Sequence, residues 1–231
     1  MVGAEIAENL EIIRERIARV AERSGRSAAD VALVAVSKTV GSDVIRKAIA
    51  AGINIFGESY IQEARTKIPQ ITAPVRWDFI GHLQRNKVRH AIGLFEMIHS
   101  VDSLVLAQEI NLAAGKRGEK ARILVEVNVS GEPTKSGIDP EGAGGLIQEL
   151  ILLPHLSVEG LMTMPPYSDD PENARPCFRA LKQLQDALNE RHGPALNLKE
   201  LSMGMSSDFA VAIEEGSTMV RIGTAIFGER A

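Results

Sequence analysis

The sequence of 231 residues contains a single cysteine, Cys177, and no long apolar run. One thiol cannot form an internal disulfide, which fits a reducing compartment. No apolar stretch approaches the roughly 18 residues of a membrane-spanning helix. The amino terminus carries Glu5, Glu8 and Glu11 instead of the basic segment of a secretion signal. We therefore expect a cytoplasmic protein without a membrane span.

Aromatic side chains and positive charge are also scarce. Aromatic residues make up 4% of the chain, with one tryptophan, and 26 lysines and arginines against 30 acidic residues give a net charge of −4. This composition disfavours a nucleic-acid surface and a platform on which bases stack. The one basic stretch, residues 84–89, is interpreted as the exposed face of a helix.

Several motifs of metal and catalytic sites are missing. The five histidines form no His-x-x-x-His pair and no cluster with the cysteine, so no metal site is expected. The sequence has no Gly-x-Ser-x-Gly elbow, which excludes the usual serine hydrolase. Residues 131–137 contain glycine, lysine and serine but lack the spacing of a phosphate-binding P-loop.

The most informative stretch begins with an unbroken run of Val, Ala and Leu at 31–36. Such a run predicts a strand buried on both faces. It leads to Lys38, at the strand end where α/β folds place their ligands. An amine whose stem lies between apolar walls has a lowered pKa and can attack a carbonyl group to form a Schiff base. The alternative is a solvated lysine that only marks the end of the strand.

Helical and extended patterns alternate along the chain. Apolar residues from Ile6 to Val20 repeat at three- and four-residue steps, which predicts a first helix that ends at Gly25. Eight strands then follow, with seven helices between them. The predicted strands cover residues 31–36, 53–56, 75–80, 97–100, 122–129, 156–162, 201–205 and 219–223.

This alternation predicts a parallel sheet, and eight such units at this length predict a closed (β/α)₈ barrel of the TIM type. We expect residues 1–231 to form a single barrel domain, in which the extra N-terminal helix takes the place of the final helix. A doubly wound open sheet is the alternative, because the fourth and seventh strands are weakly marked.

The carboxyl ends of all barrel strands lie on one face, so the candidate site residues follow from the strand ends. Phosphate sites in this fold commonly use the loops after strands seven and eight. Ser206-Ser-Asp208 is predicted to open a helix, so Ser206 and Ser207 lie at a helix N-terminus, where backbone donors favour an anion. Gly223 permits close backbone approach, and Thr224 adds a hydroxyl donor. The alternative is an ordinary helix cap and a packing glycine. The other strand ends supply Glu58, His82, Ser100, Asn128, Thr163 and Met203.

Arg221 interrupts the apolar eighth strand. A guanidinium inside the barrel needs an acceptor, because burying it without a partner is costly. A ligand nitrogen or a phosphate could accept from it. A salt bridge to Glu200 or Glu214 would serve equally well.

Seven segments, in order over nearly the whole chain, resemble one family. They are Val34-Ala-Val-Ser-Lys38-Thr39, Phe56-Gly-Glu58 with Tyr60 and Gln62-Glu63, Phe79-Ile-Gly-His-Leu-Gln84 with Asn86-Lys87, Val125-Glu-Val-Asn128 with Lys135-Ser-Gly137, Gly160-Leu-Met-Thr163, Leu201-Ser-Met-Gly-Met-Ser206, and Arg221-Ile-Gly-Thr-Ala-Ile-Phe-Gly228. The sequence resembles the pyridoxal phosphate homeostasis protein family, which is related to the N-terminal barrel of alanine racemase.

The resemblance implies a cofactor, pyridoxal 5′-phosphate (PLP), held by residues at the barrel mouth. Lys38 would bind it as a Schiff base. Ser206, Gly223 and Thr224 would hold its phosphate, and Met203 would line the pocket.

Two further residues take their expected roles from the same resemblance. By likeness to the racemase barrel, Arg221 would face the pyridine nitrogen, where a cationic donor makes the ring a weaker electron sink than an acid does. Ser59 stands where many relatives have asparagine, which puts in doubt any cofactor contact made by that amide. We expect Ser59 to cap the following helix.

The resemblance implies a carrier without a clear catalytic activity. Alanine racemase takes one of its two bases, a tyrosine, from a separate C-terminal domain, whereas this chain ends at Ala231 and contains only Tyr60 and Tyr167. The other face of the cofactor would then be open to water. We assign no catalytic residue and expect a monomer that acts in intracellular PLP storage, delivery and homeostasis, with PLP and PLP-dependent apo-enzymes as partners.

Two enzymatic alternatives remain. A PLP-dependent amino-acid racemase or lyase would use Lys38 as its base. A class I aldolase acting on a sugar phosphate would also need a Schiff-base lysine and a phosphate site, but it would be colourless, whereas bound PLP absorbs visible light.

Overall fold

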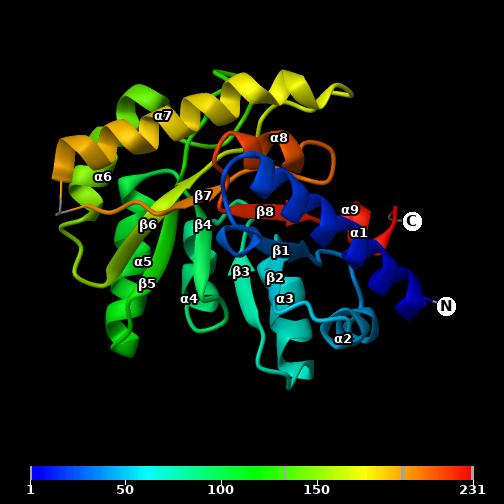
Figure 1. The fold of residues 1–231 in the computed structure, drawn as a ribbon. Coiled ribbons are helices and arrows are strands. Elements are labelled where there is room, and N and C mark those ends of the chain that lie inside the picture. The colour runs from blue at the N-terminus through cyan, green and yellow to red at the C-terminus, as the bar shows by residue number, and fades with distance from the viewer. Residues whose placement is uncertain (1, 133, 194–195, 230–231) are drawn as a thin grey trace.

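The computed structural model describes residues 2–132, 134–193 and 196–229, and its strands form a closed parallel barrel (Figure 1). The strands are β1 (Ala32–Val36), β2 (Ile55–Glu58), β3 (Arg76–Phe79), β4 (Met97–Val101), β5 (Ala121–Glu126), β6 (Leu156–Met162), β7 (Glu200–Ser202) and β8 (Met219–Ile222). Each strand pairs with the next along the chain, and β1 pairs with β8 to complete the ring. The predicted (β/α)₈ barrel is therefore confirmed, and the open-sheet alternative is wrong.

Helices surround the ring of strands (Figure 1). The α-helices are α1 (Val2–Arg23), α2 (Ser42–Ala50), α3 (Ile61–Lys67), α4 (Val88–Ala91), α5 (Leu104–Arg117), α6 (Pro140–Leu150), α7 (Arg175–His192), α8 (Phe209–Glu214) and α9 (Thr224–Phe227). Short 3₁₀ turns are η1 (Ala28–Asp30), η2 (Ile68–Gln70), η3 (Arg85–Lys87) and η4 (Pro171–Ala174). Within the described ranges, no helix is both long enough and apolar enough to cross a bilayer.

The extra N-terminal helix has a different role from the predicted one. α1 is followed, as predicted, by Gly25, whose φ of 70° lies in the left-handed region that favours glycine. α1 packs beside α8 and α9, and Asn9 Nδ2 donates to the carbonyl oxygen of Ile226 at 3.1 Å. A single-turn helix, α9, does follow β8. α1 therefore adds to the last helix of the barrel and does not replace it.

Alternating side chains divide the core into an inner and an outer layer. Large apolar clusters fill the outer layer between strands and helices. Along β1, Ala32 and Val34 belong to the inner layer, and Lys38 continues the same two-residue period. The inner layer also contains Met97, Leu124, Met162 and Met219.

Several strand boundaries differ from the predicted ones by a few residues. β2 begins two residues later than predicted, at Ile55, and β5 and β7 end three residues earlier, at Glu126 and Ser202. The residues beyond these ends leave the ladder and enter the loops at the carboxyl end of the barrel. Those loops carry most of the candidate site.

Candidate functional site

Lys38 lies two positions beyond the end of β1, at the barrel mouth. Ala35 of β1 pairs with Ile222 of β8, so the carboxyl ends of these two strands lie side by side. Lys38 is half-buried, between a buried Ser37 and an exposed Thr39. The apolar strand thus delivers its lysine to the predicted face of the barrel.

The loop after β7 meets the segment after β8 at the same mouth. Ser206 Oγ accepts from the backbone N–H of Ala225, with an N–O distance of 3.4 Å. Gly223 is buried and occupies the position before α9, and Thr224 begins that helix with an exposed side chain. Three residues predicted for the phosphate site therefore lie at one corner of the barrel, next to the end of β1.

The helix after β7 begins later than predicted. Ser206 and Ser207 form a turn, and α8 starts at Phe209 with Asp208 in the N-cap position. Asp208 Oδ1 accepts from the backbone N–H of Met205 at 2.6 Å. The helix predicted to open at Ser206-Ser-Asp208 therefore has its N-cap at the last of these three residues, and the two serines lie in the turn before it.

Arg221 lies inside the barrel and is 3% exposed. Its Nη1 donates to the carbonyl oxygen and the hydroxyl of Ser202 at 2.7 and 2.6 Å, and its Nη2 donates to the carbonyl oxygen of Thr163 at 2.9 Å. Burial lowers the pKa of Arg221 to about 10, while the negative charges of Glu126 and Asp208 act in the opposite direction. The guanidinium is therefore held in place at the inner wall of the mouth.

Neither carboxylate that the sequence offered to Arg221 is its partner. Glu200 Oε2 accepts from Thr218 Oγ1 at 2.6 Å, and Glu214 Oε2 pairs with Arg175 Nη2 at 2.6 Å. The salt-bridge alternative is wrong, because barrel closure brings neutral oxygens of two neighbouring strands to the guanidinium instead.

A hydrogen-bonded chain continues from Arg221 across the barrel interior. His99 Nδ1 lies 3.0 Å from Ser202 Oγ, and His99 Nε2 lies 3.2 Å from Asp78 Oδ2. Asp78 also accepts two bonds of 2.8 Å from Arg76. Burial lowers the pKa of His99, against the influence of Asp78. Because a carboxylate only accepts, His99 Nε2–H donates to Asp78. The chain thus links Arg221 through Ser202 and His99 to Asp78.

Glu126 is a mouth residue that the sequence analysis did not single out. It ends β5, shares the inward face with Leu124, and is 3% exposed. Burial and the charge of Asp102 raise its pKa to about 7, against the influence of Arg221. The available signal was the two-residue period along the strand, because Leu124, Glu126 and Asn128 alternate with Val125 and Val127.

Comparisons with known proteins agree with this arrangement. Residues 9–231 match the family model of the alanine racemase N-terminal domain. The pyridoxal phosphate homeostasis protein of Aquifex aeolicus is 46% identical over 224 residues, which cover 96% of this chain and 97% of that protein. The chain belongs to the pyridoxal phosphate homeostasis protein family.

Solved structures extend the likeness to three dimensions. PipY of Synechococcus elongatus, in a structure with PLP bound, is 35% identical with a TM-score of 0.86, over 96% of this chain and all of PipY (100%). Alanine racemase of Corynebacterium glutamicum is 20% identical with a TM-score of 0.76, over 99% of this chain and 62% of the racemase. The second likeness shows a shared barrel fold.

The side chain of Met203 does not line the mouth in this member of the homeostasis family. It is fully buried in the outer layer, in the cluster that contains Leu201, Val211 and Ala212. The reason is strand alternation, since Ser202 takes the inward position beside Arg221.

Glu58 and Ser59 also lie differently from their predicted positions. Glu58 is completely buried and accepts from Ser37 Oγ at 2.6 Å and Lys67 Nζ at 2.8 Å, between β2 and α3. The N-cap of α3 is Tyr60, without a side-chain capping bond, so the predicted capping role of Ser59 is wrong. The helix begins at Ile61, one residue later than it would if Ser59 were its N-cap.

The remaining strand-end residues mainly hold loops together. Ser100 Oγ, Thr163 Oγ1 and Asn128 Nδ2 donate to backbone carbonyl oxygens at 2.5, 2.8 and 2.9 Å. His82 is exposed. These side chains shape the loops of the mouth.

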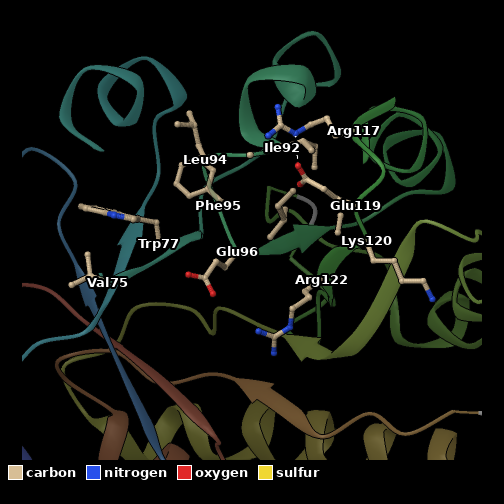
Figure 2. A pocket seen from close by; sticks show the side chains of 13 residues that line it. Val75, Trp77, Ile92, Leu94, Phe95, Glu96, Arg117, Glu119, Lys120 and Arg122 are labelled. Carbon is tan, nitrogen blue, oxygen red and sulfur yellow. Dashed lines mark hydrogen bonds and ion pairs between the residues drawn. The ribbon is translucent and has the colours of Figure 1, made fainter. Parts of the chain in front are cut away.

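Figure 2 shows a hollow at the opposite end of the barrel, with a volume of about 600 Å³. Its walls come from the amino ends of β3, β4 and β5, among them Trp77, Glu96 and Arg122. Arg117 at its rim is already paired with Glu119 at 2.6 Å. This hollow is separate from the mouth, which lies at the carboxyl ends of the strands.

Proposed function

We propose that this protein binds PLP at the carboxyl end of the barrel and acts in its intracellular storage, delivery and homeostasis. The observation that carries the proposal is the placement of three kinds of group at one mouth: the amine of Lys38, the phosphate-binding corner of Ser206, Gly223 and Thr224, and the guanidinium of Arg221. PLP offers an aldehyde, a phosphate and a ring nitrogen, so the donor set fits the cofactor.

Each residue has a defined part in this proposal. PLP would supply a reactive aldehyde, and the Lys38 amine would hold it as a Schiff base with release of one water molecule. Ser206, Thr224 and the backbone N–H groups that begin α9 would donate to its phosphate. Arg221 would donate toward the ring nitrogen while Ser202 and Thr163 hold its two terminal nitrogens.

The side chains around the mouth favour a carrier over a racemase. A guanidinium cannot protonate the ring nitrogen, and an unprotonated ring stabilises a substrate carbanion only weakly. Tyr60 and Tyr167 are 55% and 83% exposed, and Tyr167 donates to Asp169 at 3.0 Å. That hydrogen bond raises the pKa of Tyr167, which makes it a poorer base at neutral pH. Neither tyrosine resembles a positioned second base.

The same proposal covers the domain, the oligomeric state and the partners of the protein. We infer that residues 1–231 act as one PLP-binding unit, as a monomer in the cytoplasm, and pass PLP to dependent apo-enzymes. The names of the relatives, pyridoxal phosphate homeostasis proteins, support this role. PipY with PLP bound supports the choice of ligand.

The visible spectrum of the PLP-loaded protein tests the proposal. We expect an imine absorption band in the wild type that Lys38→Ala abolishes, while the free energy of unfolding changes by less than about 1 kcal/mol because the side chain is only half-buried. Lys47→Ala changes an exposed lysine of α2; it is the matched control and should retain the band. A band that survives in Lys38→Ala, or its absence from the wild type, contradicts the proposal. Incubation with L- and D-amino acids should show neither racemisation nor keto-acid release.

A further inference from the structure

The peptide groups on both sides of Lys38 are held by one buried ionic cluster outside the barrel wall. Lys67, at the end of α3, donates to the carbonyl oxygen of Ser37 at 2.8 Å. Glu63, one helical turn earlier, accepts from the backbone N–H of Thr39 at 2.7 Å. One residue before Lys38 and one residue after it are therefore attached to the same helix.

The ammonium of Lys67 has all its donors engaged. Besides the Ser37 carbonyl, it contacts Glu58 Oε1 at 2.8 Å and Glu63 Oε1 at 2.6 Å. An ammonium carries three N–H donors, and these three acceptors account for them. The Lys67 side chain is 6% exposed, so removal of the charge would leave two buried or half-buried carboxylates without their cation.

The backbone held by this cluster has an unusual conformation. Among the residues that the structure describes, Thr39 is the only non-glycine residue with a positive φ, at 62°. This region is unfavourable for a β-branched residue, and such a conformation persists only where the surroundings enforce it. The bond from Thr39 N–H to Glu63 holds this conformation together with the turn bond of 3.0 Å from Val40 N–H to the Ser37 carbonyl oxygen. Lys67 in turn holds Glu63.

We propose that Lys67, together with Glu63 and Glu58, is the positioning device that aims the Lys38 side chain at the cofactor aldehyde. The inference rests on the proposed function, since it concerns the same lysine. Condensation needs the amine nitrogen at the aldehyde carbon, and small displacements of a reacting group are costly. Because Lys67 and Glu63 act through the main chain of residues 37 and 39, they are positioning residues and do not touch the cofactor.

The test compares two ligands that differ only at the reacting carbon. PLP can condense with Lys38, whereas pyridoxine 5′-phosphate has the same ring and phosphate but an alcohol in place of the aldehyde. We expect Lys67→Met and Glu63→Ala to weaken PLP binding by about tenfold or more while pyridoxine 5′-phosphate binding changes by roughly twofold or less, because only condensation depends on the aim of the amine. Glu63→Gln keeps an acceptor for Thr39 N–H and should restore most of the PLP affinity.

Controls separate positioning from loss of stability. Gln185→Leu, on α7, removes a buried hydrogen bond of 3.0 Å to the Leu198 carbonyl oxygen, so it should lower the melting temperature without changing the ratio of the two affinities. Glu63 is 25% exposed, so Glu63→Ala keeps the test valid if Lys67→Met fails to fold. Equal weakening of both ligands, or unchanged PLP binding in Glu63→Ala, overturns the inference. A wild type that binds both ligands equally would instead overturn the proposed Schiff base.

Discussion

At the residue scale, the mouth combines a buried cation with a carboxyl group that resists ionisation. Neutral oxygens of Ser202 and Thr163 accept from Arg221, and the negative charges of Glu126 and Asp208 also act on it. Burial raises the pKa of Glu126 to about 7. The net charge that a phosphate ligand meets at this mouth therefore depends on pH near neutrality.

The raised pKa of Glu126 predicts a pH-dependent stability. Between its ordinary pKa of 4.5 and the folded value of about 7, the unfolded state loses its proton first, so the free energy of unfolding falls as the pH rises. The difference between the two pKa values corresponds to a destabilisation of roughly 3 kcal/mol, which is present in full once the pH exceeds the folded pKa of about 7. We expect Glu126→Gln to be more stable than the wild type at pH 8, by about 1–3 kcal/mol, and to differ little at pH 4.

Urea unfolding at the two pH values measures this effect. Glu141→Gln, on the exposed face of α6, is the control and should behave like the wild type at both. A Glu126→Gln variant that is less stable than the wild type at pH 8 would mean that the carboxylate stabilises the fold, contrary to the stated sign.

At the element scale, few backbone contacts join β7 and β8, the two strands whose following loops carry Ser206, Gly223 and Thr224. β7 has three residues, and its register with β8 consists of Ser202 opposite Met219. Side chains reinforce the seam. Ser217 Oγ lies within hydrogen-bond distance of the carbonyl oxygens of Leu201, Met203 and Met219 at 3.2, 2.8 and 3.0 Å. The loops after both strands depend on this buried hydroxyl.

Removal of this hydroxyl should weaken both the fold and the corner. Ser217→Ala leaves buried carbonyl oxygens with fewer donors, so we expect a loss of about 1–3 kcal/mol in the free energy of unfolding. Inorganic phosphate should also bind less tightly, because the strands that carry Ser206 and Gly223 are less firmly joined. Denaturant unfolding and a phosphate titration measure the two effects. Ser207→Ala, at an exposed turn, should leave stability unchanged; equal effects of the two substitutions would contradict the account.

Strand ends were predictable where apolar runs stop, and helix starts were harder to place. The run at 31–36 marks β1 and so locates Lys38, because six apolar residues in succession have few other interpretations. At 206–208, two serines and an aspartate all suit an N-cap, and the composition does not select among them; in the structure Asp208 takes the position and closes the preceding turn on the Met205 N–H. The partners of Arg221 could not be predicted from the sequence either, because the oxygens of Ser202 and Thr163 come close to it only when the barrel closes.

At the scale of the whole molecule, closure of the ring brings residues from the two ends of the sequence together. Val34 pairs with Arg221 across the β1–β8 seam, so the strand that leads to Lys38 lies against the strand that leads to Gly223. α1 and α9 cover this seam from outside (Figure 1). The alternation of strands and helices predicted the ring, and the ring in turn accounts for the site.

Reductive trapping tests the central claim most directly. Borohydride reduces a Schiff base to a stable amine, so PLP-loaded protein treated in this way, digested and analysed by mass spectrometry should carry its label on the peptide that contains Lys38. The account predicts labelling at Lys38 and its loss in Lys38→Ala. Labelling confined to other lysines, or no label at all, would contradict it.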